Sequence, residues 1–226
     1  MFSTIKPRLR GIKNALLLLI RGEWREFLIR LRISLGHIDL KDDPTEAVTE
    51  RTHYYADSGG LAFDKIMASF NITPHDAIVD FGCGKGGILI SLSKYPFSRI
   101  TGVEIAPELV EIAKTNIRKL NIKNVDIVCS DAAEFKQLDE YNYFYFFDPF
   151  PCSVMQDVMD NIEKSIFEQP RDVIIIYLNP HCHELIEANN IFFKTKELPH
   201  FEHRCFIYKN IDKNSPEFII PKTARP

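Results

Sequence analysis

From residue 75 onward, short apolar runs alternate with segments in which apolar residues recur at helical spacing. The runs are rich in Ile, Val, Phe and Tyr, which predicts β-strands. We expect strands near 77–81, 99–104, 125–129, 142–148 and 172–178, and helices near 87–94, 107–119, 153–168 and 181–189. Strands that alternate with helices over short connections indicate a parallel sheet covered on both faces.

Two further β-prone runs, 191–197 and 204–209, are close enough in sequence to form an antiparallel hairpin. Ahead of the first strand, a helix is expected over about 60–70. Three parts are predicted along the chain. They are a helical extension with its linker (1–50), the main α/β domain (51–210) and a loosely attached, proline-containing tail (211–226).

The first 35 residues carry apolar side chains at helical spacing, with a break near Gly22. This pattern predicts one kinked or two short amphipathic helices. Lys and Arg far outnumber Glu here, and they flank a Leu-rich stripe that includes Trp24 and Phe27. Such helices suit a lid over a substrate, a peripheral membrane contact or a dimer element, and the sequence leaves all three open.

Composition narrows the class of protein. The chain has 226 residues, 45% of them hydrophobic, and a formal net charge of -3, which gives no reason to expect a nucleic-acid partner. The five cysteines show no paired spacing, which predicts a reducing compartment without a disulfide framework. The apolar run 15–20 is too short to span a bilayer. We expect a cytoplasmic protein, with residues 1–35 as the part that would contact the inner face of the membrane.

The most informative stretch is 80–87, Asp-Phe-Gly-Cys-Gly-Lys-Gly-Gly, which lies between the apolar runs 77–79 and 88–92. This order predicts a strand, a tight turn and a helix. Glycines in such a turn let a nucleotide-like ligand approach bare backbone at the start of the helix. We therefore expect an adenosine-containing cofactor.

Two fingerprints fit this loop. Gly82-x-Gly84-x-x-Gly87 fits the dinucleotide pattern, which leaves a nicotinamide-dependent (NAD) oxidoreductase as an alternative. The spacing Asp80-x-Gly82-x-Gly84-x-Gly86 resembles motif I of the class I S-adenosylmethionine (SAM) methyltransferases. A carboxylate before the first glycine suits the ammonium group of SAM and would repel a pyrophosphate.

The resemblance implies a Rossmann-like α/β fold with a seven-stranded, mostly parallel sheet, an antiparallel C-terminal hairpin and SAM as cofactor. Gly-Cys-Gly-Lys-Gly in the loop and Tyr-Leu-Asn-Pro at 177–180 are similar to one subgroup of this class. The cofactor site carried over from the family comprises Asp80, Gly82, Cys83, Gly84, Gly86, Glu104, Ile105, Asp131, Ala132 and Tyr55.

Three of these residues have roles that the resemblance specifies. Glu104 would accept hydrogen bonds from the ribose hydroxyls, which dinucleotide enzymes also require. Asp131 would accept one from the adenine amine, although it also suits the N-cap of the next helix. Tyr55, beside Tyr54, would close over the methionine end of SAM, where an aromatic face favours the sulfonium.

The turn Asp148-Pro149-Phe150-Pro151 resembles the Asp/Asn-Pro-Pro-Tyr/Phe motif of amino-group methyltransferases. The resemblance implies that Asp148, Pro149 and Phe150 form the catalytic turn, with Asp148 accepting a hydrogen bond from the target atom. Phe150 stands where the family has its second proline, so a turn in which Phe150 simply packs is the alternative. The expected acceptor is a nitrogen or oxygen of a small molecule or a cell-envelope glycan, and a protein lysine is the alternative.

Histidines and cysteines gather near the end of the domain, at His181-Cys182-His183 and at His200, His203 and Cys205. A zinc site would need ligands that converge, whereas adjacent residues point in different directions and Cys-x-x-Cys is absent. We expect no metal. His181 and His183 follow the fifth strand, where they would line the acceptor pocket or start a helix.

Overall fold

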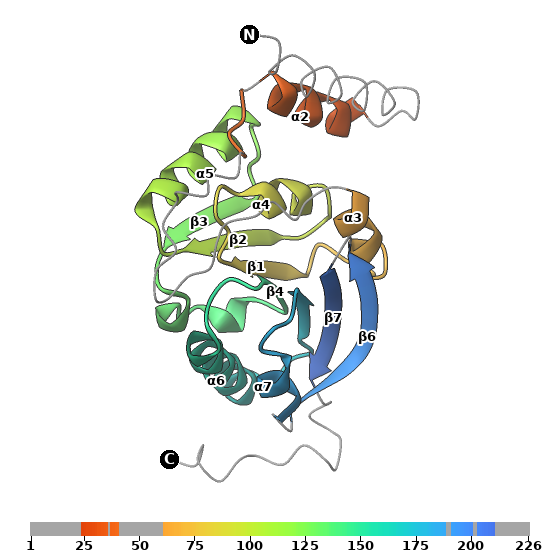
Figure 1. Ribbon diagram of the computed structural model, residues 1–226, viewed down its shortest axis with the longest axis vertical. Coiled ribbons are helices and arrows are strands. Elements are labelled where there is room, and N and C mark those ends of the chain that lie inside the picture. The colour runs from red at the N-terminus through yellow and green to blue at the C-terminus, as the bar shows by residue number, and fades with distance from the viewer. Residues whose placement is uncertain (1–23, 36, 41–60, 189–190, 201–202, 211–226) are drawn as a thin grey trace.

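The computed structural model describes residues 24–35, 37–40, 61–188, 191–200 and 203–210. Its centre is a seven-stranded sheet of order β3-β2-β1-β4-β5-β7-β6 (Figure 1). The strands are β1 (Ala77–Phe81), β2 (Arg99–Glu104), β3 (Val125–Cys129), β4 (Tyr143–Phe147), β5 (Ile174–Leu178), β6 (Phe192–His200) and β7 (His203–Asn210). The first five strands pair in parallel, whereas β7 runs antiparallel to β5 and β6. The predicted fold class is confirmed.

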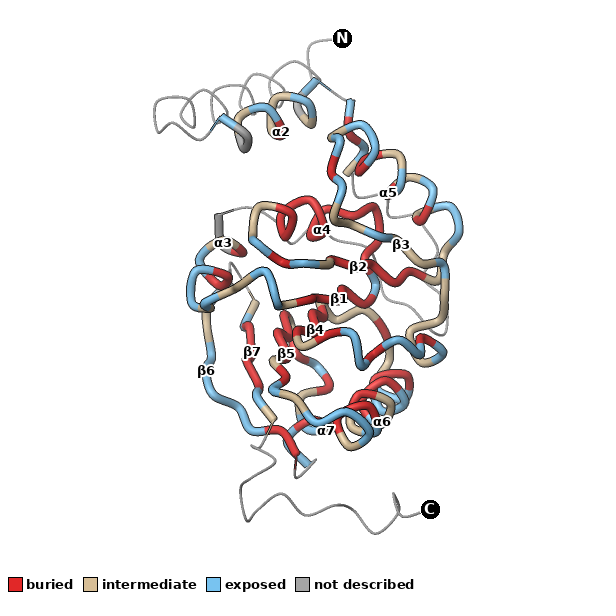
Figure 2. The backbone as a smooth tube through the Cα atoms, turned by 180° about the vertical axis from the view of Figure 1, so that it is seen from behind, coloured by how far each residue is buried: buried red, intermediate tan, exposed pale blue. Residues whose placement is uncertain are grey.

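The helices are α2 (Trp24–Ser34), α3 (Leu61–Met67), α4 (Gly87–Leu92), α5 (Pro107–Lys119), α6 (Cys152–Glu168) and α7 (His183–Ala188). Two short 3₁₀ helices, η1 (Ala132–Glu134) and η2 (Leu138–Glu140), lie between β3 and β4. Figure 2 shows that the central strands are buried and that α5 and α6 each expose one side.

Alternate residues of each central strand enter two separate hydrophobic cores. In β1, Val79 and Phe81 pack in the core that contains the buried side of α6, whereas Ile78 packs in the core that contains α3 and α4. Side chains of a strand alternate between the two faces of the sheet. A strand covered on both faces must therefore be apolar throughout, which explains the uninterrupted runs seen in the sequence.

The strands were easier to delimit from sequence than the helix that follows β5. Strands β1, β2 and β3 begin and end where the sequence predicts, but α7 begins at His183 and not at 181. Asn179 has a positive φ of 50°. The amide of His181 donates to the carbonyl of Asn179 at 2.9 Å, which closes a tight turn ahead of the helix.

The described residues of the predicted linker, 37–40, are held to the domain by hydrogen bonds with α5, mainly through one asparagine. The Asn116 side chain on α5 accepts from the amide of Asp39 at 3.0 Å and donates to the Asp39 carbonyl at 2.7 Å. It also donates to the carbonyl of Lys85 in the glycine loop at 3.0 Å. Because the adjacent Ile38 is buried, residues 37–40 pack against the body of the domain.

The described part of the N-terminal extension is α2. Its Ile29 is buried, whereas Trp24 and Leu28 are exposed. Residues 1–23 lie outside the described part of the chain, so the lid, membrane and dimer interpretations stay predictions. No helix within the described residues is long and apolar enough to cross a membrane.

Candidate active site

The glycine loop forms the turn from β1 to α4. Gly82, Gly84 and Gly86 have positive φ angles of 80°, 51° and 84°, which side chains with a Cβ rarely adopt. At Gly82 a Cβ would lie only 2.5 Å from the Cβ of Pro149, which belongs to the loop after β4. The predicted cofactor turn and the predicted acceptor turn are therefore in direct contact.

Two buried carboxylates lie beside this loop, near the carboxyl ends of β1 and β2. Glu104 accepts from the amide of Gly84 through Oε2 and from the amide of Ala106 through Oε1, both at 3.0 Å. Burial and then the nearby charge of Glu104 raise the pKa of the Asp80 carboxyl well above its usual range. Two acidic groups in one buried place are stabilised by a ligand that is cationic and rich in hydroxyls.

SAM carries an ammonium group and two ribose hydroxyls, all of which donate hydrogen bonds, so the carboxylate acceptors of this site fit it. The glycine loop supplies a surface without side chains, and Asp80 and Glu104 supply the acceptors. Ile105 and Ala132 are half-buried at the same edge of the sheet. Tyr54 and Tyr55 lie outside the described residues, so their predicted contact with SAM stays a prediction.

Asp131 occupies the N-cap of η1. Its Oδ1 accepts from the amide of Ala133 at 3.0 Å, which is the capping alternative considered from sequence. The amide of Ser130 donates to the carbonyl of Glu104 at 3.0 Å, and this bond holds the end of β3 against the end of β2. Asp131 thus lies at the same edge as Glu104, and its contact with adenine stays a prediction.

We expect Asp80→Asn to stabilise the cofactor-free protein while weakening its binding of SAM. Folding raises the pKa of the Asp80 carboxyl, so the folded state becomes less stable as pH rises above the pKa that this carboxyl has in the unfolded chain. The cofactor-free protein should therefore be less stable at pH 8 than at pH 5. The side-chain amide of Asp80→Asn does not ionise, so the variant does not show this loss of stability at high pH. It also removes a charge-assisted hydrogen bond to the ammonium, so SAM affinity should fall about 30-fold, or about 2 kcal/mol. Urea unfolding at both pH values and calorimetry with SAM measure the two effects.

Asp76, at the other end of β1, provides the matched control. Partial burial raises the pKa of Asp76, but hydrogen bonds from Asn142 and Thr73 outweigh burial and lower it overall. This carboxylate stabilises the fold above the pKa of the unfolded chain, and the stabilisation is lost as pH falls. Asp76→Asn should therefore destabilise the protein at neutral pH. Destabilisation by Asp80→Asn as well would contradict the account given for Asp80.

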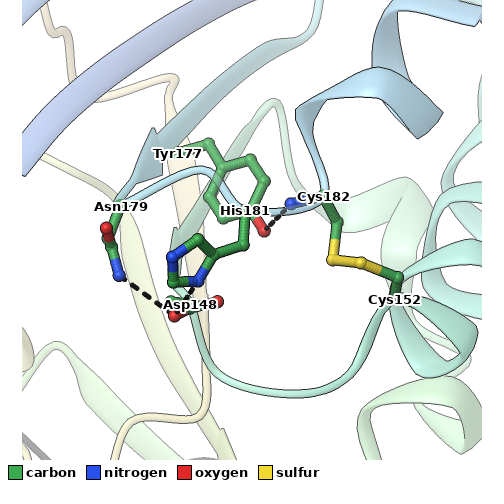
Figure 3. Close-up of a disulfide and its surroundings, with 6 residues drawn as sticks. All are labelled: Asp148, Cys152, Tyr177, Asn179, His181 and Cys182. Atoms are coloured by element: carbon green, nitrogen blue, oxygen red, sulfur yellow. Dashed lines mark hydrogen bonds and ion pairs between the residues drawn. A yellow bond between two sulfur atoms is a disulfide. The ribbon is translucent and has the colours of Figure 1, made fainter.

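The loop after β4 holds the predicted catalytic turn. Asp148 has a positive φ of 40°, and its Oδ2 accepts from Nδ2 of Asn179 at 3.0 Å. The same oxygen lies 2.6 Å from Nδ1 of His181 (Figure 3). Phe150 is buried and meets Phe146 edge to face with ring centroids 6.2 Å apart, which is the packing alternative considered from sequence. A contact between Phe150 and the acceptor stays a prediction.

A disulfide joins the two loops on either side of this site. Cys152, the first residue of α6, is bonded to Cys182, which precedes α7, with their Cα atoms 5.4 Å apart (Figure 3). The expectation of no disulfide is therefore wrong. The two cysteines are 30 residues apart, and only the parallel pairing of β4 with β5 brings them together.

Sequence reasoning missed the partnership of Asp148 with Asn179. The sequence shows this asparagine only as part of a turn, and no local spacing links it to an aspartate 31 residues earlier.

The other histidines near this edge have separate partners. Nδ1 of His183 lies 3.5 Å from Glu187, and the ring of His203 meets Phe147. Within the described ranges, no three metal-binding side chains converge.

Comparison with known proteins identifies the family of the chain. Residues 72–210 match the family described as "Methyltransferase domain". The chain is 28% identical over 139 residues to an uncharacterized RNA methyltransferase of Chlamydia muridarum, covering 58% of this chain and 34% of the relative. It is also 28% identical over 123 residues to the ribosomal protein L11 methyltransferase of Lactobacillus johnsonii, covering 53% and 38%. The chain thus spans little more than a third of the length of these relatives.

Solved structures show the same fold. The RNA methyltransferase of Salinibacter ruber in complex with S-adenosylhomocysteine superposes with a TM-score of 0.53 at 18% identity, over 70% of this chain and 94% of that one. The L11 methylase of Lactobacillus delbrueckii subsp. bulgaricus gives 0.52 at 13% identity, over 66% and 76%. At such identities the likeness establishes the fold alone. The family match confirms the predicted SAM-dependent methyltransferase domain, whereas the Gly-Cys-Gly-Lys-Gly subgroup stays a prediction. The chain belongs to the methyltransferase-domain family.

Proposed function

We propose that this protein transfers a methyl group from SAM to a nitrogen or oxygen of a small-molecule or cell-envelope glycan acceptor. The observation that carries the proposal is the contact between the two loops, in which Pro149 lies directly against Gly82. Asp148, whose side chain is 13% exposed, directly precedes Pro149 in the chain, which supports a place for its carboxylate near the cofactor loop. The family match favours SAM over a nicotinamide cofactor.

SAM, when bound, supplies a methyl group on a positively charged sulfur. The protein's own residues then have to hold and align the reactants and exclude water from them. Displacement at a methyl carbon bonded to a sulfonium depends more on alignment than on acid or base catalysis. Asp80 and Glu104 would hold the cofactor through its ammonium and hydroxyls. Asp148 would orient the acceptor, with Pro149 fixing its distance from the glycine loop and Phe150 anchoring the turn in the core.

The relatives are named as methyltransferases of RNA and of a ribosomal protein, but the net charge of -3 argues against a general affinity of this chain for nucleic acid. A protein lysine remains the second candidate acceptor, because the turn at Asp148 resembles a motif of amino-group methyltransferases. Both RNA and protein are therefore included as fractions in the test below.

The test incubates the full chain with tritiated SAM and separated cell fractions of small molecules, glycans, lipids, RNA and protein. We expect label in the small-molecule or glycan fraction, and we expect Asp148→Ala to slow that labelling about 100-fold or more. Calorimetry should show that Asp148→Ala binds SAM as the wild type does. Label that enters only RNA or only protein would overturn the acceptor class, and full labelling by Asp148→Ala would overturn the assigned turn.

A further inference from the structure

One imidazole is held at the proposed acceptor site by a carboxylate. Nδ1 of His181 lies 2.6 Å from Oδ2 of Asp148, whose position is fixed in turn by Nδ2 of Asn179 at 3.0 Å. An ionised carboxylate only accepts hydrogen bonds, so Nδ1 carries the hydrogen, and in the neutral form of the ring Nε2 has the free lone pair. The His181 side chain is 65% exposed, so that lone pair is accessible to a ligand.

The backbone around this pair is held in an unusual conformation. Asp148 and Asn179 both have positive φ angles, of 40° and 50°, although neither is glycine. Residues in this sparsely populated region cost free energy and persist where the surrounding structure fixes them, which is frequent at functional sites. The disulfide from Cys182, the neighbour of His181, to Cys152 ties the two loops together (Figure 3). The imidazole is thus oriented before any ligand arrives.

We propose that His181 is the catalytic base and that the methylated group is a hydroxyl. This assignment rests on the proposed function and narrows it. A neutral amine attacks without prior loss of a proton, whereas a hydroxyl is a weak nucleophile until its proton leaves. A carboxylate that orients an imidazole and stabilises its protonated form suits removal of a proton from a hydroxyl.

The step balances without any additional reactant beyond SAM. The acceptor oxygen forms a bond to the methyl carbon, its O–H bond breaks, and the proton passes to Nε2 of His181. The electron pair of the broken carbon–sulfur bond returns to sulfur, which neutralises the sulfonium. The imidazolium that results is paired with Asp148 until the proton is released to water. Asp148 and Asn179 act here as positioning residues.

The first measurement asks which atom carries the methyl group. The labelled product from the small-molecule or glycan fraction is treated with hydriodic acid, which releases O-methyl groups as methyl iodide, and separately with mild alkali, which releases methyl esters as methanol. We expect release by hydriodic acid and none by alkali. Label on nitrogen would overturn the hydroxyl assignment and leave the proposed methyl transfer intact.

The second measurement tests the base itself. His181→Gln keeps a polar side chain but cannot take up the proton, so kcat should fall about 100- to 10,000-fold while the affinity for SAM stays unchanged. His181→Ala should recover part of its rate when imidazole is added. His75→Gln, an exposed residue at the opposite end of β1, serves as the matched control and should keep wild-type kcat. A kcat of His181→Gln within about threefold of the wild type would overturn the assignment.

A spectroscopic readout does not depend on turnover. In protein containing ¹⁵N-histidine, at a pH at which the ring is neutral, the nitrogen shifts of His181 should report hydrogen on Nδ1. Asp148→Ala should redistribute that hydrogen between the two nitrogens, and an Nε2–H form in the wild type would overturn the proposal. A wild-type protein that binds SAM yet labels no fraction would overturn the proposed function and this assignment with it.

Discussion

Replacing Gly82 with alanine is expected to destabilise the protein and to weaken its binding of SAM. The residue has a φ of 80°, a conformation that costs an L residue about 1–2 kcal/mol. Its new Cβ would lie 2.5 Å from the Cβ of Pro149, and relief of such an overlap costs a further 1–3 kcal/mol or so. We expect the free energy of unfolding to fall by about 3 kcal/mol. SAM affinity should fall about 100-fold, because the loop must move away from Asp80 and Glu104.

Gly86 makes a matched control for this variant. Its φ of 84° is nearly the same, but the nearest atom to an added Cβ would be the Cβ of Ala113, at 3.4 Å. Gly86→Ala should therefore cost only the conformational strain, about 1–2 kcal/mol. Urea unfolding and calorimetry with SAM compare the two variants. Equal losses would show that the close approach to Pro149 has no effect.

The double variant Gly82→Ala with Pro149→Gly tests the contact directly. Removing the proline side chain removes the atom that the new Cβ would strike, so part of the stability lost in Gly82→Ala should return. Residues in contact show coupling energies of about 0.5–3 kcal/mol in such cycles, whereas separated sites are additive. Strict additivity would mean that the cofactor loop and the acceptor loop are energetically independent, contrary to the geometry.

The central sheet could be predicted because burial on both faces leaves a strong local signal. Ile78 and Val79 point to opposite cores, so β1 begins with a continuous apolar run (77–79), and the glycines of the following turn mark the end of the strand. The acidic residue at the end of β2 could be found for a related reason. Carboxyl ends of parallel strands meet at one edge of the sheet, so the position of Glu104 in the sequence gives its place in the fold.

The partners of Asp148 could not be predicted in the same way. Its bonds to Asn179 and His181 span more than thirty residues and depend on two loops with positive φ angles at non-glycine residues. A tight turn through Asn179 and His181 precedes α7, so the sequence predicts the start of that helix two residues too early. The burial of Ile38 could not be predicted for a similar reason, because the next residue, Asp39, is held by Asn116, which is 77 residues away in the sequence.

Loss of the disulfide is expected to destabilise the protein by about 3–4 kcal/mol, the chain-entropy value for a closed loop of this length. The double variant Cys152→Ser with Cys182→Ser should show this in urea, and wild-type protein with dithiothreitol should match it. Cys129→Ser, which changes an exposed free cysteine, should be neutral. Five titratable thiols in the unreduced wild type would contradict the bond.

Because the disulfide joins the loops that carry Asp148 and His181, its loss should also loosen their contact and slow methyl transfer. The same reagent would then change stability and rate together, whereas Cys129→Ser would change neither.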